Sequence, residues 1–383
     1  MDFTLRPEQE AYLAELRSFG EKELAPHYRA DDLAGTLRPD LIPTMARMGL
    51  TGLRVPERFG GQEADAVTTG LAAEEIARHD FNACYVLLDS ALVSDILLAG
   101  ATEEQRARWM PSIASGATVP AVCLTEPGQG SDAANLALRA DPDDDGDGWR
   151  LIGEKTSISL GMYTPVGVVF ARTGGPGARG VSAFFADLTD DRLSRTPLDD
   201  LGSRSIGRAS LYFDGVRVGR ADMIGAEGEG FVAVMRGFDY SRAVIGLMCL
   251  GIASAALDDA MAYAREREAF GRPIGTFQGV AFPLVEFATQ IRAARLLCYE
   301  ALALKDAGED PAVPANMAKW WAPKLAADAV HQALLTFGHA GWSTDNTIGQ
   351  RLRDVIGLEI GDGTAQIAKL VVARHLLGRS TAP

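Results

Sequence analysis

The chain has 383 residues, of which 47% are hydrophobic, and a formal net charge of −14 at pH 7. This length and apolar content allow two or three domains around a sizeable core. The negative charge argues against nucleic acid or an anionic membrane surface as a partner, because both would repel the protein. We therefore expect no nucleic-acid binding and no membrane insertion.

The cysteines, the histidines and the first residues exclude several other classes. Four cysteines and five histidines are scattered along the chain, without the spacing of a disulfide framework or a metal site. The opening Met-Asp-Phe-Thr-Leu-Arg lacks the basic start and apolar stretch of a signal peptide. The longest low-polarity stretch, 243–257, is too short to span a bilayer. We expect a cytoplasmic protein without a bound metal.

Hydrophobic periodicity divides the chain into three parts. Residues 1–120 show the pattern of helices, expected at 7–19, 69–79 and 85–99. Residues 121–230 change to short strands, expected at 166–172, 181–188 and 211–218. Residues 231–383 return to helices, expected at 231–268, 281–307, 316–338 and 364–377, enough for a four-helix bundle. This order predicts the α+β class, with three domains at 1–120, 121–230 and 231–383.

Two acidic segments need an explanation. Asp89 and Asp95 interrupt the apolar helix 85–99, and a buried carboxylate needs a partner or a task. The alternative is that both are exposed, or hydrogen-bonded at a subunit contact. The segment 141–148 superficially matches the start of a calcium loop, but Ile152 stands where that loop needs a glutamate. We predict a solvated hairpin turn there.

Two glycine-containing segments can carry chemistry. Residues 123–132, Cys-Leu-Thr-Glu-Pro-Gly-Gln-Gly-Ser-Asp, predict a loop whose backbone and hydroxyl groups can wrap a flat polar ring. This loop has no phosphate-binding lysine and no dinucleotide fingerprint. In Gly361-Asp-Gly-Thr-Ala-Gln366, Thr364 is a candidate helix N-cap, and Asp362 lies in a turn that the two glycines permit. Such a carboxylate can serve as a base, or it can be only a turn residue.

Four separated segments closely resemble the signature of the flavin-dependent acyl-CoA dehydrogenase family. They are Thr125–Asp132, Arg267–Gln278, Phe337–Gly341 and Arg353–Gln366. The resemblance implies an N-terminal helical domain, a central β-barrel or sandwich and a C-terminal four-helix bundle. It also implies one FAD per subunit, a homotetramer, an acyl-CoA substrate and an electron-transfer flavoprotein as electron acceptor.

The resemblance assigns roles to individual residues. Asp362 takes the position of the catalytic glutamate, which removes the α-proton of the thioester while flavin N5 accepts a hydride from the β-carbon. Arg267, Phe270 and Gln278 would contact the FAD of a neighbouring subunit. The alternative for Asp239 and Arg242 is an ion pair on the helix surface. The expected FAD contacts are Thr125, Ser131, Ser157, Ser159, Arg267, Phe270, Gln278, Thr364 and Gln366. The expected substrate contacts are Ser131, Asp239, Arg242 and Gly363.

The chain departs from the family pattern at four places. Aspartate replaces glutamate at 362, and Ser241, which precedes Arg242, cannot serve as the base that some members carry there. Ser157 replaces the aromatic residue that lies against the flavin, which puts the docking of an electron-transfer flavoprotein in doubt. Leu335 replaces a glutamine that contacts FAD.

The aspartate and the segment 155–161 resemble the branch that acts on cyclohexanecarboxyl-CoA and related alicyclic thioesters. A second carboxylate at Asp89 would then allow 1,4- in place of 1,2-dehydrogenation. Reduction of a cyclic enoyl thioester, and action on a carrier-protein thioester, stay open. A DNA-associated or scaffold flavoprotein of the same fold is the non-enzyme alternative, although the net charge argues against DNA.

Overall fold

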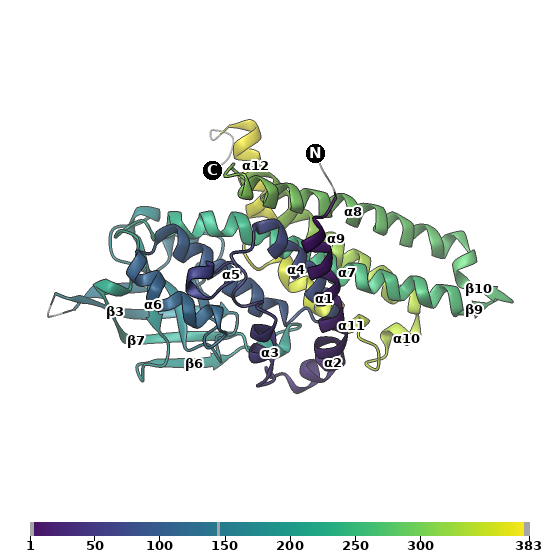
Figure 1. Ribbon diagram of the computed structural model, residues 1–383, viewed down its shortest axis with the longest axis horizontal. Coiled ribbons are helices and arrows are strands. Elements are labelled where there is room, and N and C mark those ends of the chain that lie inside the picture. The colour runs from purple at the N-terminus through teal and green to yellow at the C-terminus, as the bar shows by residue number, and fades with distance from the viewer. Residues whose placement is uncertain (1–3, 144–145, 379–383) are drawn as a thin grey trace.

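The computed structural model describes residues 4–143 and 146–378, in which a mostly helical N-terminal region, a β-sheet and a bundle of long helices follow one another along the chain (Figure 1). Residues 1–3, part of the N-terminal segment in which no signal peptide is expected, lie outside the described residues. So do residues 144–145, in the middle of the expected hairpin turn. The α+β order of elements predicted from periodicity is confirmed.

The described part of the first region, from residue 4 on, contains six α-helices. Its central helix, α5, is buried along almost its whole length. In the turn before this helix, Asp80 accepts hydrogen bonds from the backbone N–H groups of Asn82 (2.8 Å) and Ala83 (3.0 Å). The helix before α5 begins at Ala66, after the N-cap Asp65, three residues earlier than predicted. The six helices are α1 (Pro7–Phe19), α2 (Ala25–Ala34), α3 (Leu41–Arg47), α4 (Ala66–His79), α5 (Cys84–Gly100) and α6 (Glu103–Ala114).

The middle region is one eight-stranded mixed sheet. The strand order is β6-β7-β3-β2-β4-β5-β8, with β1 parallel to β4. The three predicted strands are present, and the predicted hairpin joins β2 to β3 as an antiparallel pair. The strands are β1 (Ala121–Cys123), β2 (Arg139–Pro142), β3 (Gly148–Ile158), β4 (Val166–Arg172), β5 (Val181–Asp187), β6 (Leu193–Pro197), β7 (Ala209–Gly219) and β8 (Met223–Ile224).

The sheet buries side chains on both faces. Along β4, Val169 faces a core inside the sheet region, whereas its neighbours Val168 and Phe170 face a second core shared with α5 and α6. This double burial explains why β4 reads as an unbroken apolar run. The rings of Trp149 on β3 and Phe184 on β5 lie 5.4 Å apart although these strands are not neighbours in the sheet. The two ends of the sheet therefore fold over one another, as in a sandwich.

The last region contains three long helices and the predicted C-terminal helix. They are α7 (Gly230–Glu266), α8 (Gln278–Asp306), α9 (Ala312–Phe337) and α12 (Ala365–Leu377). Two shorter helices, α10 (His339–Trp342) and α11 (Ile348–Ile356), were not predicted. A small hairpin of β9 (Glu268–Ala269) and β10 (Arg272–Pro273) joins α7 to α8 at the far end of the molecule from the sheet (Figure 1).

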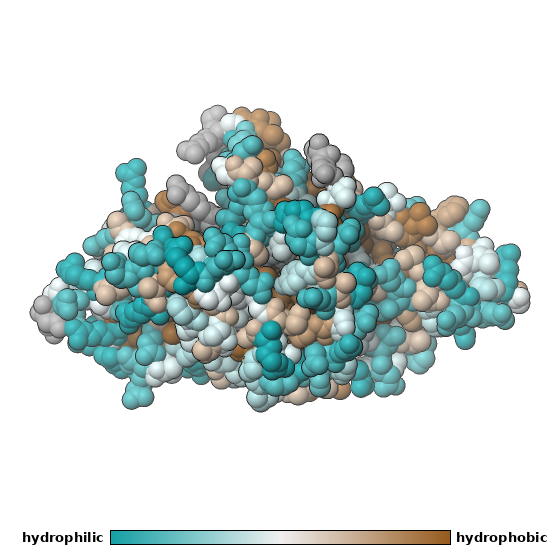
Figure 2. All heavy atoms as spheres, in the orientation of Figure 1, coloured by the Kyte–Doolittle hydropathy of each residue, from teal (hydrophilic) through white to brown (hydrophobic). Residues whose placement is uncertain are grey.

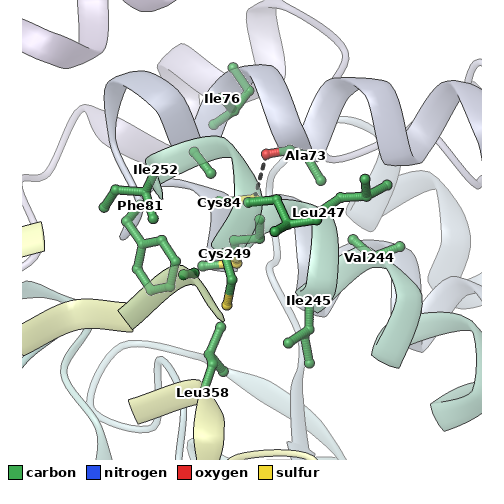
Figure 3. Close-up of a cluster of buried hydrophobic side chains, with 14 of the residues drawn as sticks. Ala73, Ile76, Phe81, Cys84, Val244, Ile245, Leu247, Cys249, Ile252 and Leu358 are labelled. Carbon is green, nitrogen blue, oxygen red and sulfur yellow. Dashed lines mark hydrogen bonds between the residues drawn. The ribbon is translucent and has the colours of Figure 1, made fainter. Parts of the chain in front are cut away.

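Helix α7 is the axis on which the three regions meet. It packs against α4, α5, α8 and α9, and Figure 3 shows its residues Val244 to Ile252 meeting Ala73, Cys84 and Leu358 in one buried cluster. Gly251 allows this contact, because a Cβ there would collide with the Glu74 carbonyl oxygen of α4. Within the described residues, α7 alone is long and apolar enough to cross a membrane, but 78% of its apolar window is buried in the fold.

Candidate active site

A cavity of about 640 Å³ lies where the three regions join. Helix α5 forms one wall, the loop after β1 and the end of β3 form another, and α7 with the turn before α12 forms a third. This volume is within the range typical of small-molecule sites. The cavity brings together segments that are more than 200 residues apart in the sequence.

Asp362 lines this cavity on an unusual turn. Its own φ is +55° and that of Gly363 is +96°, whereas Gly361 is not left-handed. The prediction that the flanking glycines carry the turn is therefore only half right: the aspartate itself adopts the left-handed conformation, which Asp tolerates better than most residues. Thr364 caps α12 as predicted, because its side chain accepts a hydrogen bond from the Ile367 N–H at 3.4 Å.

Two basic residues and a hydroxyl hold the Asp362 turn. Ser241 on α7 donates to Oδ2 of Asp362 at 2.8 Å. Arg242 Nε donates to the Asp362 carbonyl oxygen at 3.4 Å, and Lys319 Nζ on α9 donates to the Gly363 carbonyl oxygen at 2.9 Å. Burial lowers the pKa of Lys319, and the charge of Asp362 opposes that shift. Both the carboxylate and the backbone of the turn are thus fixed by side chains from the bundle.

Sequence reasoning missed the roles of Ser241 and Lys319. From the sequence, Ser241 is only a residue that cannot replace the base. Its contact with Asp362 depends on how α7 packs against a turn 121 residues away. Lys319 is only 1% exposed in an otherwise apolar stretch of α9. A lysine among buried apolar residues is the one signal that could have drawn attention to it.

Hydroxyl groups gather on the sheet side of the same cavity. Thr125, Ser131, Ser157 and Ser159 all line it, together with Thr364 from the opposite side. Ser157 has φ +57°, which turns the backbone at the end of β3. Hydroxyl and backbone groups suit an uncharged polar ring system. These residues therefore fit the ring end of FAD.

A buried ion pair positions the loop that carries Thr125. Lys155 Nζ donates to Glu126 Oε1 at 2.8 Å and to the Leu124 carbonyl oxygen at 3.0 Å, and Lys155 is fully buried. Glu126 also accepts from the Leu138 N–H at 2.9 Å. Burial lowers the pKa of Lys155 to about 8, although the Glu126 charge opposes the shift. The pair ties β3 to both ends of the loop.

Other expected contacts lie away from the cavity within this chain. Arg267, Phe270 and Gln278 are exposed around the β9–β10 hairpin, and Phe270 is 96% exposed with φ +55°. Gln366 is exposed on α12. The predicted partner of Arg267, Phe270 and Gln278 is the FAD of a neighbouring subunit, whereas Gln366 was expected to meet FAD near the Asp362 turn and lies outside the cavity lining. Leu335 is also exposed, on α9.

Of the expected substrate contacts Asp239 and Arg242, only one lies at the cavity. Arg242 lines the cavity, whereas Asp239 does not. The two side chains form an i,i+3 ion pair at 3.2 Å on α7, and Asn316 lies 3.5 Å from Asp239. Burial raises the pKa of Asp239, and the Arg242 charge partly offsets that shift. The two side chains thus form an ion pair, as in the alternative, but not on the helix surface, because Arg242 is buried.

The α5 wall of the cavity carries a polar group. Asp89 lines it with only 7% of its surface exposed, and Oδ2 has no hydrogen-bond partner among the described residues. Burial raises its pKa well above the usual range, the Asp362 charge adds to the shift, and Arg208 opposes it. Asp95 is different, because Arg54 (3.1 Å) and Lys305 (2.9 Å) pair with it. Both aspartates are buried, so the alternative of exposed carboxylates is wrong.

Comparison with known proteins identifies the family. The N-terminal, middle and C-terminal domain models of acyl-CoA dehydrogenase match residues 6–117, 121–216 and 228–377. The chain is 34% identical to the probable acyl-CoA dehydrogenase FadE25 of Mycobacterium tuberculosis, over 98% of this chain and 97% of that protein. It is 32% identical to a 3-(aryl)acrylate reductase of Clostridium sporogenes, over 94% and 96% of the two chains. The butyryl-CoA dehydrogenase structure from Megasphaera elsdenii matches with a TM-score of 0.95 and 32% identity, over 98% of this chain and 100% of that one. The chain belongs to the acyl-CoA dehydrogenase family, and it is an FAD-dependent oxidoreductase that acts on acyl-CoA.

Proposed function

We propose that Asp362 is the base that removes the α-proton of an acyl-CoA thioester, giving the α,β-enoyl-CoA. The observation that carries this proposal is the place of Asp362, which lines one cavity with the hydroxyl groups that fit the flavin ring. Bound FAD supplies the acceptor for the hydride that leaves the β-carbon. The proton passes to the Asp362 carboxylate, and the two carbons gain a double bond.

The surrounding residues prepare Asp362 for this step. The hydroxyl of Ser241 holds one carboxylate oxygen, so the other stays available for the substrate. Arg242 and Lys319 occupy the carbonyl oxygens of the turn and fix its position. Holding the base in a reactive geometry matters, because a misplacement of about 1 Å can cost on the order of a hundredfold in rate.

Within this reaction we propose an alicyclic substrate, such as cyclohexanecarboxyl-CoA. Aspartate is one methylene shorter than glutamate and leaves room for a crowded α-carbon beside the turn. Leu88, Leu92 and Phe238 give the cavity an apolar part that suits a ring. The 1,4-dehydrogenation alternative needs Asp89 as a second base, but burial favours its neutral form, so we place it second.

Anaerobic titration of the holoenzyme with straight-chain, branched and cyclic acyl-CoAs tests the proposal. Substrates should bleach the flavin absorbance, and Asp362→Asn should lower the bleaching rate by about 10²- to 10⁴-fold while FAD stays bound. The matched control is Asp328→Asn, an exposed carboxylate paired with Lys324 on α9. Normal bleaching by Asp362→Asn would refute the base assignment. If no thioester bleached the flavin, the scaffold alternative would be favoured. The reductive direction is measured by first reducing the enzyme and then following how far an enoyl thioester restores the flavin absorbance.

We also propose that four chains assemble, in the cytoplasm, and that an electron-transfer flavoprotein reoxidises the FAD. Large apolar side chains exposed on α8, α10, α12 and the β9–β10 hairpin support assembly, and Figure 2 shows apolar residues over α8 and α12. Sedimentation should give four times the chain mass of 40.8 kDa, and Val285→Asp on α8 should reduce it. A monomer in both proteins would contradict the assembly. These exposed side chains are Phe270, Phe282, Val285, Trp342, Leu376 and Leu377.

A further inference from the structure

Helix α5 places two polar groups on the cavity wall where its other cavity-lining residues are leucines. Tyr85 and Asp89 are four residues apart, so they share one face of the helix, and both line the cavity. Asp89 Oδ2 is buried and has no hydrogen-bond partner among the described residues, and the buried Tyr85 hydroxyl makes no well-aligned hydrogen bond, although the Ser203 and Arg208 side chains interact with it. Buried polar atoms without partners are rare in proteins, because each one loses its hydrogen bonds to water.

A third polar group faces this pair from the segment before β7. Arg208 lines the cavity and lies close enough to Tyr85 and Asp89 that its charge opposes the rise in pKa that burial causes at both groups. Its Nε is 3.0 Å from Asp200 Oδ2, but neither atom makes an aligned hydrogen bond. Arg208 therefore places a guanidinium group, held by Asp200, beside Tyr85 and Asp89 at the cavity wall.

The charges in the cavity indicate which ligand fits this group. The cavity lining contains three cations among the described residues, and each already has a carboxylate: Arg208 pairs with Asp200, Arg242 with Asp239 and Arg353 with Asp32. The Asp362 carboxylate adds a further negative charge to the lining. A carboxylate on the acyl part of the substrate would meet more negative than positive charge from the protein. A neutral oxygen there would meet hydrogen-bond donors and acceptors.

We propose that Tyr85, Asp89 and Arg208 form a specificity subsite for a neutral oxygen, a hydroxyl or a carbonyl group, on the acyl part of the substrate. This inference rests on the proposed function, since it assumes that the cavity holds an acyl-CoA. A neutral carboxyl at Asp89 both donates and accepts, as the Tyr85 hydroxyl does, so the subsite can bind either kind of oxygen. Asp95 on the same helix shows the contrast, because the fold itself supplies its partners.

A pair of substrates that differ by one oxygen tests the subsite. We would compare cyclohexanecarboxyl-CoA with 4-hydroxycyclohexanecarboxyl-CoA, and butyryl-CoA with 4-hydroxybutyryl-CoA, by kcat/KM with the holoenzyme. In at least one pair the oxygenated substrate should be preferred about tenfold or more, because an analogue without the oxygen leaves buried polar groups unpaired.

The variants Tyr85→Phe and Asp89→Leu should each reduce that preference ratio several-fold. The matched control is Tyr12→Phe, which removes another buried hydroxyl without a well-aligned hydrogen bond, on α1 and outside the cavity lining, and it should keep the ratio. Equal or better turnover of the unsubstituted substrates, or a ratio that Tyr85→Phe leaves unchanged, would overturn the subsite while the proposed function stands. If no thioester reduces the flavin, the proposed function itself fails.

Discussion

At the scale of single residues, the candidate site depends on one aspartate in a conformation that few residues adopt. Asp362 has φ +55°, and Ser241, Arg242 and Lys319 hold its carboxylate and the carbonyl oxygens of its turn. A left-handed residue persists when its surroundings over-determine it, and such positions gather at functional sites. The strain and the contacts both indicate that the position of this carboxylate matters more than its local stability.

The first prediction concerns Ser241, whose hydroxyl donates to Asp362 Oδ2 at 2.8 Å. The change Ser241→Ala should lower kcat by about tenfold with little change in KM, because the loss of one hydrogen bond to a charged group lets the base leave its reactive position. Stopped-flow reduction of the flavin under saturating substrate measures this step. The control is Ser254→Ala, also on α7 but outside the cavity lining, which should keep kcat. An unchanged reduction rate in Ser241→Ala would contradict the positioning role.

How much of the site the sequence predicts depends on the distance over which residues interact. Thr364 as N-cap and Asp362 in a turn follow from six consecutive residues, and both positions are confirmed. The donor Ser241 could not be predicted, because its role arises from packing between α7 and a distant turn. The roles that the family resemblance assigns to Arg267 and Phe270 stay predictions, since one chain does not bring them to the cavity.

At the scale of elements, periodicity predicts what each segment becomes but not what joins it to its neighbours. The strands at 166–172, 181–188 and 211–218 and the long helices are present, because their apolar patterns extend over many residues. Helices α10 and α11 were missed: α10 is a single turn, and α11 is short, although its apolar residues at 348, 352, 355 and 356 follow the spacing of an amphipathic helix. Asp354 of α11 is fully buried, and it accepts hydrogen bonds from the Tyr28 hydroxyl (2.7 Å) and the Ser203 N–H (2.6 Å). Long-range partners such as these cannot be read from local spacing.

The second prediction concerns the pair that ties β3 to the loop after β1. Lys155→Met should destabilise the protein by about 3–5 kcal/mol, because it leaves the Glu126 carboxylate buried without its counter-charge. The double change Glu126→Gln/Lys155→Met should cost less, since a glutamine oxygen can still accept from the loop backbone. Urea unfolding of the holoenzyme measures both.

The control for this pair is Lys324→Met, an exposed lysine with an i,i+4 carboxylate partner, which should change stability by about 1 kcal/mol or less. Because Thr125 lies next to Glu126, flavin fluorescence should also report looser FAD in Lys155→Met. If the double variant were as unstable as the single one, the uncompensated charge would not be the cause.

At the scale of the whole molecule, the fold buries carboxyl groups that accept hydrogen bonds, from neighbouring backbone N–H groups at Asp80 and from distant residues at Asp354. Burial raises the pKa of Asp80 to about 7 and that of Asp354 to about 6. The folded protein therefore binds protons that the unfolded chain has released, since an unfolded aspartate titrates near 3.8. On account of these two groups, stability is greatest at low pH and decreases as pH rises through the window from about 4 to about 7.

The third prediction isolates Asp80. Asp80→Asn keeps the side-chain oxygen that accepts from the Asn82 and Ala83 N–H groups but cannot ionise, so it removes this group's contribution to the pH dependence. The free energy of unfolding of the variant relative to wild type should rise by about 4 kcal/mol between pH 4 and pH 8, as a pKa difference of about three units implies. Urea titrations of both holoenzymes at equal protein concentration measure this difference. Subtracting the wild-type value removes the contribution of acids with a lowered pKa, such as Asp65 and Glu75, whose effect on the pH dependence has the opposite sign. The exposed Asp258→Asn, measured across the same range, gives the control for the loss of a surface carboxylate. If the difference in free energy of unfolding between Asp80→Asn and wild type did not change with pH, the prediction would be contradicted. Burial of Asp80 would then not contribute to the pH dependence of stability.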